Sequence, residues 1–180
     1  KISVFPLHFT KRCDRMKNFI LINGTMGAGK TTVSRALQKL LPQAVFLDGD
    51  WCWDSDPFLV TDETKKMVLE NIAFLLSQFL ACKAYQNVIF CWVMHEREIL
   101  SDLLSRLDTK QCRVLCVTLT QSEEVLRARL RLDIERGLRD TGVIERSLAR
   151  LGGYAQMDTK KLNTDTLSPE EAAGQIAAML

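Results

Sequence analysis

The distribution of apolar residues along the chain predicts an alternation of strands and helices. Short apolar runs of β type are followed by longer stretches in which apolar residues recur at helical spacing. Strands are predicted near residues 18–23, 44–47, 87–93, 113–119 and 160–163, and helices over 30–41, 62–85, 96–107, 122–136, 143–157 and 169–180. This order is typical of an α/β fold, in which helices cover both faces of a parallel sheet and ligands bind beyond the carboxyl ends of the strands.

Length and composition favour a single domain over residues 16–180. The chain has 180 residues, of which 47% are hydrophobic and 26% charged, and its net charge is +2. This composition excludes wholesale disorder and gives no basic excess that would indicate a nucleic-acid partner. The longest apolar run, residues 88–94, is far shorter than the roughly 20 residues of a membrane-spanning helix.

The cysteines and the amino terminus add two further expectations. The six cysteines include no Cys-x-x-Cys pair, and those in apolar runs are interpreted as buried thiols, which favours a cytoplasmic protein without a membrane partner. Residues 1–15 precede a more regular pattern that opens at Met16. We treat them as an N-terminal extension and assign them no function.

The most specific motif is a glycine-rich segment between the first predicted strand and helix. Gly24-Thr25-Met26-Gly27-Ala28-Gly29-Lys30-Thr31 has the spacing G-x-x-x-x-G-K-[ST], and Thr32 adjoins it. Such glycines let backbone N–H groups turn toward a polyphosphate, where the helix N-terminus adds positive potential. Lys30 is expected to reach the terminal phosphates and Thr31 to supply an oxygen to Mg²⁺. We predict a nucleoside triphosphate site.

A cluster of acidic and aromatic residues follows the second predicted strand. Residues 48–56 contain four aspartates and two tryptophans. We assign Asp48 to the metal side and Asp50 to the hydroxyl of a phosphoryl acceptor, which it would orient or deprotonate. Trp51 and Trp53 are candidates to stack on a ring of the acceptor. The alternative is a solvated Asp-Gly-Asp turn whose indoles cap the core.

On these motifs, residues 18–50 resemble the P-loop small-molecule kinases, a group that contains shikimate kinase, gluconate kinase and chloramphenicol phosphotransferase. The resemblance extends more weakly over most of residues 17–180. It implies a three-layer fold with a five-stranded parallel sheet of order 2-3-1-4-5, and ATP with Mg²⁺ as the phosphoryl donor. It also implies an acceptor-binding segment at about 51–86 and an arginine-bearing lid before the last strand.

The sequence departs from this group where the acceptor would bind. Trp92-Val93-Met94-His95-Glu96 replaces the glycine triplet that holds the acceptor in shikimate kinase. Residues 51–96 contain no arginine and only three lysines. An acceptor with its own phosphate group would require cationic side chains in this segment. An uncharged or cationic acceptor is therefore favoured. His95 is a candidate acceptor contact, or alternatively a hydrogen-bonded loop residue.

Arginines are concentrated where the lid is expected. Seven fall between residues 127 and 150 without a single lysine, namely Arg127, Arg129, Arg131, Arg136, Arg139, Arg146 and Arg150. Residues 136–142, which we interpret as the lid, contain Gly137 and Gly142 as candidate hinges. Arg136 and Arg139 are the candidate phosphate contacts. The resemblance implies that Arg129, late in the preceding helix, reaches the adenine or the lid. The alternative for part of this cluster is a solvated helix face with ion pairs.

Together these features predict an ATP-dependent kinase, a monomer or homodimer, that transfers the γ-phosphoryl group to a hydroxyl of a small polar molecule. Three alternatives stay open: a nucleoside or nucleotide kinase, a regulatory P-loop ATPase without an acceptor, and a kinase for nucleic-acid 5′-hydroxyls. The last is disfavoured because the acceptor segment lacks a basic track.

Overall fold

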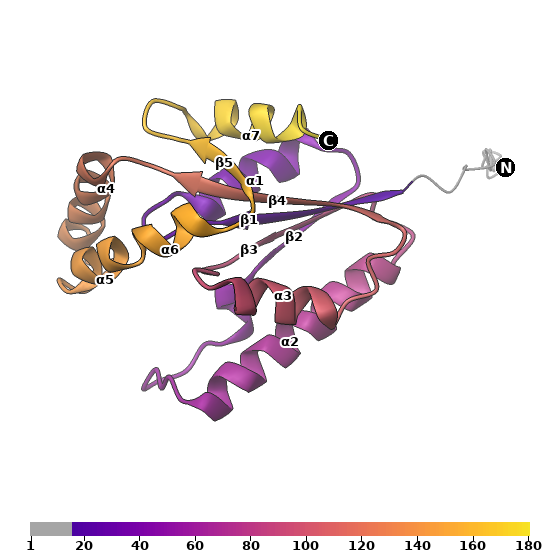
Figure 1. Ribbon diagram of the computed structural model, residues 1–180, viewed down its shortest axis with the longest axis horizontal. Coiled ribbons are helices and arrows are strands. Elements are labelled where there is room, and N and C mark those ends of the chain that lie inside the picture. Colours follow the sequence, from indigo (N-terminus) through magenta and orange to yellow (C-terminus); the bar gives the residue numbers. More distant parts are fainter. Residues whose placement is uncertain (1–15) are drawn as a thin grey trace, which may run out of the picture.

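The structure is a computed structural model that describes residues 16–180. The predicted N-terminal extension, residues 1–15, lies outside the described residues. The described part forms three layers, with helices on either face of one parallel sheet (Figure 1).

The sheet has five parallel strands in the order β2-β3-β1-β4-β5. Its strands are β1 (Lys17–Asn23), β2 (Ala44–Asp48), β3 (Asn87–Cys91), β4 (Cys112–Thr120) and β5 (Lys160–Asn163). The central strand β1 pairs with β3 on one side and β4 on the other. The predicted fold class and strand order are confirmed.

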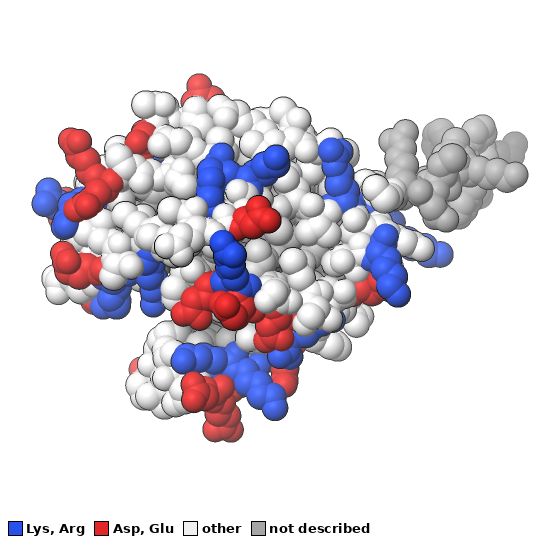
Figure 2. Space-filling model, viewed as in Figure 1, with Lys and Arg blue, Asp and Glu red and all other residues white. Residues whose placement is uncertain are grey.

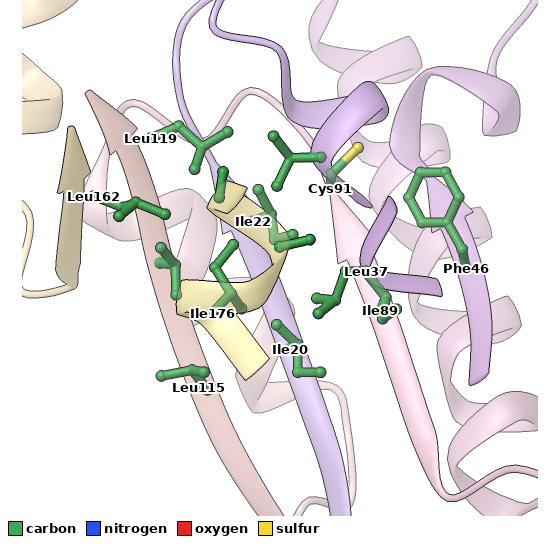
Figure 3. Packing of buried hydrophobic residues seen from close by; sticks show 14 of the residues in the cluster. Ile20, Ile22, Leu37, Phe46, Ile89, Cys91, Leu115, Leu119, Leu162 and Ile176 are labelled. Atoms are coloured by element: carbon green, nitrogen blue, oxygen red, sulfur yellow. The ribbon is translucent and has the colours of Figure 1, made fainter. Parts of the chain in front are cut away.

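The helices α1 (Lys30–Leu40) and α7 (Pro169–Ala177) cover one face of the sheet, and α2 (Asp62–Ala81) and α3 (Arg97–Ser105) cover the other (Figure 1). Successive β1 residues alternate between these faces, as the period of two in a strand requires. Ile20 and Ile22 pack beneath α1 and α7 with Leu37 and Ile176 (Figure 3). Each such fully buried side chain contributes about 1.5–3 kcal/mol to folding, so both faces stabilise the sheet.

A lobe of three helices stands at the carboxyl end of the sheet. It consists of α4 (Glu123–Glu135), α5 (Val143–Ala149) and α6 (Leu151–Gln156), with the predicted lid as the loop between α4 and α5 (Figure 1). Met26 packs against the small core of this lobe, and the Thr25 hydroxyl donates to the backbone oxygen of Ser147 at 3.1 Å. The lobe is thereby attached to the glycine-rich loop.

The single helix predicted over residues 143–157 is wrong, because the chain breaks between α5 and α6. The Arg150 N–H bonds the Ser147 carbonyl three residues back, at 3.3 Å, rather than four. Gly152 and Gly153 follow, and each glycine lowers helix stability by about 1 kcal/mol relative to alanine. The break leaves Arg150 at the junction of the two helices.

Several other elements are shorter than predicted by one to four residues, among them α2 and β3. Helix α2 ends at Ala81 rather than at residue 85, because Cys82 is extended and the Lys17 ammonium donates to the carbonyls of Phe79 and Cys82. Strand β3 ends at Cys91 rather than at residue 93. The Asn23 side chain replaces the ladder there, since it accepts from the Met94 N–H at 2.9 Å and donates to the Met94 carbonyl.

After β2 the chain forms a short 3-10 turn, η1 (Gly49–Cys52). Basic and acidic side chains are interspersed over the face shown in Figure 2.

Within residues 16–180, no helix combines the length and the apolar character that a membrane span requires.

Candidate nucleotide and acceptor site

A cavity of about 1340 Å³ opens at the carboxyl ends of the strands. One wall, the P-loop side, comprises residues 26–33 together with Arg129, Leu132, Asp133, Arg136, Arg139, Arg150, Thr164, Leu167, Pro169 and Ala172. The other wall, the tryptophan side, comprises Asp48, Gly49, Asp50, Trp53, Phe58, Val60, Lys65, Val68, Leu69, Trp92, Val93, His95, Glu96 and Ile99. The cavity therefore joins the two motifs that the sequence analysis singled out.

The glycine-rich loop leads directly from β1 into α1. Gly29 precedes the helix with φ of 85°, a left-handed conformation that favours glycine, and a Cβ there would meet no atom within 4 Å. The first turn of α1 contains no acidic residue, so its N–H groups keep their positive potential. This geometry is suited to an anion at the helix N-terminus.

The Lys30 ammonium lies within this loop and donates to the Thr25 carbonyl at 3.0 Å. Burial lowers the pKa of Lys30, while the Asp50 and Asp48 carboxylates act in the opposite direction. Gly24 and Thr25 lie beneath the cavity wall rather than on it, whereas Met26, Gly27, Ala28 and Thr32 line it. Lys30 is thus held where a polyphosphate would be bound.

Thr31 and Asp48 meet at the floor of the cavity. The Thr31 hydroxyl donates to Asp48 Oδ2 at 2.6 Å, and Asp48 Oδ1 accepts from the Asp50 N–H at 3.1 Å. The Thr31 hydroxyl and the Asp48 carboxylate both offer oxygen atoms, the ligands that Mg²⁺ prefers. Besides one or two protein ligands, Mg²⁺ usually keeps several waters and phosphate oxygens. The pair therefore fits the predicted metal side, although no three acidic, histidine or cysteine side chains of residues 16–180 group into a metal cage.

Asp50 is oriented by an indole that sequence analysis did not select. Trp92 Nε1 donates to Asp50 Oδ1 at 3.1 Å, and the Trp92 ring lies directly over Gly49. A Cβ on Gly49 would stand 2.5 Å from the ring, so glycine is required for this approach. Burial and the Asp48 carboxylate raise the pKa of Asp50, whereas Lys30 and the Trp92 hydrogen bond lower it. The Trp92 hydrogen bond thus opposes the increase in the Asp50 pKa that the surroundings of Asp50 cause.

His95 also lines the cavity, and its Nε2 lies 3.3 Å from a Glu96 carboxylate oxygen. Burial and the Arg150 guanidinium lower the pKa of His95, so the imidazole is neutral at pH 7. Its buried Nδ1 has no hydrogen-bond partner among the described residues. The structure brings His95 to the predicted site.

Among the arginines of the lobe, Arg129, Arg136, Arg139 and Arg150 line the cavity. Arg129 donates to the Thr164 carbonyl at 2.7 Å, which fixes it at the end of β5. Arg139 pairs with Asp133 at 3.1 Å. Within the described chain no ion pair is formed by Arg136 or Arg150, so their guanidinium groups are available to an anion. Arg150 was missed because the helix break that exposes it was not predicted from Gly152-Gly153.

The two tryptophans of the acidic segment have different surroundings. Trp53 lines the cavity. Trp51 lies outside the lining; its ring contacts Phe46 at 5.2 Å, and the Arg35 guanidinium lies 4.8 Å above it. The structure therefore does not bring Trp51 to the cavity with the other predicted acceptor residues. Trp92, Phe58 and Val60, which the sequence analysis did not select, line the cavity instead. Of these three, only Trp92 has a sequence signal, because it directly follows a buried strand and so lies at the ligand-binding edge of the sheet.

With the cavity described, the chain can be compared with known proteins. Residues 20–151 match the family described as AAA domain. The match spans the glycine-rich loop, the whole tryptophan side of the cavity, and most of the P-loop side and of the lobe. This chain belongs to the AAA domain family. None of the curated proteins matches the chain.

Solved structures share the fold at low identity. A tunicamycin resistance protein from Deinococcus radiodurans superposes with a TM-score of 0.71 and 21% identity, covering 91% of this chain and 95% of that chain. A gluconokinase from Sinorhizobium meliloti 1021 gives 0.65 and 20% over 92% and 94%. A shikimate kinase from Acinetobacter baumannii, in complex with shikimate, gives 0.62 and 21% over 92% and 93%. The resemblance to P-loop small-molecule kinases is confirmed at the level of the fold.

Proposed function

We propose that this AAA domain protein is a kinase that transfers the γ-phosphoryl group of ATP to a hydroxyl of a small molecule. One observation carries the proposal: Asp50 stands beside Asp48 in a cavity shared with the glycine-rich loop, with one carboxylate oxygen held by Trp92. A nucleotide-binding switch would not need a second acid on the far side of the phosphate loop.

The residues divide the reaction between them. The backbone amides of residues 26–31 and the Lys30 ammonium would hold the terminal phosphates. Asp50 Oδ2, which accepts no hydrogen bond from residues 16–180, would orient the acceptor hydroxyl. It would take the hydroxyl proton as the acceptor oxygen bonds to the γ-phosphorus and the bond from that phosphorus to the bridging oxygen breaks, so that ADP leaves. Arg136, Arg139 and Arg150 would balance charge on the transferred group, and Arg129 with Thr164 and Leu167 would border the base.

Thr31 and Asp48 would hold Mg²⁺, Thr31 by its hydroxyl and Asp48 through the metal's waters. When bound, the ion neutralises phosphate charge. The Thr31 hydroxyl donates to Asp48 Oδ2, so these two oxygens lie together.

The test separates transfer from binding with one pair of variants. Asp50→Asn should abolish phosphoryl transfer to a metabolite fraction, followed with γ-labelled ATP, while ATP affinity stays within about twofold of wild type. Asp54→Asn removes an exposed acid of the same segment that does not line the cavity, and it should keep full transfer. Full transfer by Asp50→Asn contradicts the base assignment; ATP hydrolysis with no phosphorylated product favours the regulatory ATPase.

A further inference from the structure

The tryptophan side of the cavity is built largely from apolar side chains. Six of them form what we call the apolar wall: Trp53, Phe58, Val60, Leu69, Trp92 and Ile99. They come from three segments, namely the loop after η1, helix α2 and the chain that runs from the end of β3 into α3. A wall assembled from separate segments around one acid, Asp50, resembles a ligand surface more than the edge of a core.

Two members of the apolar wall are exposed although they are large hydrophobic residues. Phe58 is 61% and Val60 59% exposed. The Phe58 ring lies against Trp53, with ring centroids 4.5 Å apart. Exposed apolar surface beside a cavity marks a site that a ligand covers, because burying it there is favourable.

The charges of this side do not suit an acid. Among the described residues, Lys65 is the one lysine that lines the tryptophan side of the cavity. The Lys65 side chain is 60% exposed, and its ammonium lies 3.3 Å from an Asp62 carboxylate oxygen. His95 is neutral, and Asp50 and Glu96 are acidic. The four cavity arginines come from the opposite wall. Arg129 is bonded to the Thr164 carbonyl and Arg139 is paired with Asp133, while Arg150 acts on His95 rather than on Trp53, Phe58 or Val60. A carboxylate packed on Trp53, Phe58 and Val60 would therefore lose hydration with only the exposed Lys65 as a cation of the same side.

The size of the cavity allows a ring beside the nucleotide. Its volume of about 1340 Å³ exceeds the roughly 300–1,000 Å³ typical of a pocket for one ligand. An acceptor as small as a short polyol would leave the apolar wall uncovered.

We infer, on the basis of the proposed function, that the acceptor carries its hydroxyl next to an aromatic or aliphatic face and bears no anionic group. Its face packs on Trp53, Phe58 and Val60 while the hydroxyl reaches Asp50. Sugar acids of the gluconate and shikimate kind are therefore poor ligands of this chain.

The first experiment compares matched probes by NMR, with a non-hydrolysable ATP analogue and Mg²⁺ present. The neutral ring is para-benzenedimethanol, its acidic counterpart is para-(hydroxymethyl)benzoate, and erythritol lacks the ring; gluconate and shikimate complete the set. The three tryptophans give three indole N–H signals. The neutral ring should shift those of Trp53 and Trp92 and leave that of Trp51, an internal control, in place. For so small a probe we expect a dissociation constant on the order of millimolar.

The neutral ring should bind at least about tenfold more tightly than the benzoate, erythritol, gluconate or shikimate. Binding of any of the acids as tight as that of the neutral ring overturns the inference. So does a neutral ring that shifts no indole signal at concentrations near its solubility limit.

Two pairs of variants exploit neighbouring residues of one segment. Phe58→Ser should weaken the neutral ring about tenfold without changing nucleotide affinity, whereas Leu59→Ser, at an exposed position outside the cavity lining, should not. Val60→Arg should improve binding of the benzoate about tenfold, and Leu59→Arg should leave it unchanged. Equal effects at residues 58 and 59, or no gain with Val60→Arg, contradict the proposed surface.

The same samples keep this inference separate from the proposed function. Phosphoryl transfer is followed by ³¹P NMR after ATP replaces its analogue. Selective binding of the neutral ring supports the acceptor class even when no probe is phosphorylated, in which case the kinase proposal is the one that fails. Transfer to gluconate or shikimate in preference to the ring preserves the kinase proposal and overturns the acceptor class.

Discussion

The two walls of the cavity are built in different ways. On the P-loop side, contiguous residues 26–31 present backbone N–H groups and two side chains, and the helix that follows fixes their direction. On the tryptophan side, single side chains from three segments converge on Asp50. A site made by contiguous backbone tolerates few sequences, whereas a site made by convergent side chains can change its ligand with a few substitutions.

The largest effect should come from the P-loop side. Lys30→Met removes the ammonium that lies within the glycine loop, and we expect phosphoryl transfer to fall by about three orders of magnitude, the scale of a group that stabilises transferred charge. Lys39→Met, at an exposed position in the last turn of the same helix, should change the rate by less than about twofold. Steady-state transfer rates with γ-labelled ATP measure both, and similar losses would show that helix stability rather than the site was affected.

This difference between the walls also explains what could be predicted. The strand order and the residues of the P-loop side follow from local patterns: Gly29, Lys30 and Thr31 are contiguous and can only be arranged in one way after a buried strand. Asp48 and Asp50 were found because they end a strand at the same edge of the sheet.

The rest depends on contacts that no local pattern contains. Trp51 and Trp53 are equivalent in the sequence, yet the 3-10 turn directs one toward Phe46 and the other into the cavity. Trp92 became a partner of Asp50 through Gly49, a close approach between β2 and β3. Arg150 required knowing that a helix breaks.

On the tryptophan side, loss of the Trp92–Asp50 hydrogen bond should reduce turnover by about ten- to a hundredfold and leave ATP affinity unchanged. Trp92→Phe deletes the indole N–H and keeps the aromatic ring, while Gly49→Ala displaces the ring by its Cβ. Both should reproduce the loss. In an Asp50→Asn background neither should lower the residual rate further, and an additive loss would mean that Trp92 acts by another route.

The same two variants should move the pH profile in a defined direction. The Trp92 hydrogen bond lowers the pKa of Asp50, so its removal raises that pKa. Because Asp50 must be ionised to accept a proton, the acid limb of the rate profile should shift to higher pH. A variant that merely disturbs packing would lower the rate at all pH values without shifting the limb.

Arg150 tests whether the lobe serves the P-loop side. Arg150→Met should weaken binding of a non-hydrolysable ATP analogue about tenfold, the equivalent of about 1.4 kcal/mol for a charge-assisted hydrogen bond. Arg146 lies in the preceding helix turn, outside the cavity lining, and pairs with Asp140; Arg146→Met should have less than a twofold effect. Titration calorimetry measures both constants, and an equal loss in the two variants would assign the effect to the lobe as a whole.

The smallest effect should appear in stability, at the boundary between the walls. Burial and Asp48 raise the pKa of Asp50 above its ordinary 3.8, so the ionised carboxylate is less favourable in the folded than in the unfolded protein at neutral pH. Because Asp50 is exposed, solvent screens much of this penalty. Asp50→Asn, which retains an oxygen for Trp92, should therefore increase the melting temperature by no more than about 1 °C at pH 7. The ionised Asp50 carboxylate destabilises the folded state at pH values above its folded pKa, and this penalty disappears when the carboxyl group is protonated. The difference in melting temperature between wild type and variant should therefore shrink as the pH falls through that pKa. Calorimetric scans over this pH range measure the change in melting temperature, with Asp54→Asn as the exposed control. A lower melting temperature for Asp50→Asn than for wild type at pH 7 would mean that the ionised Asp50 carboxylate stabilises the fold, contrary to this prediction.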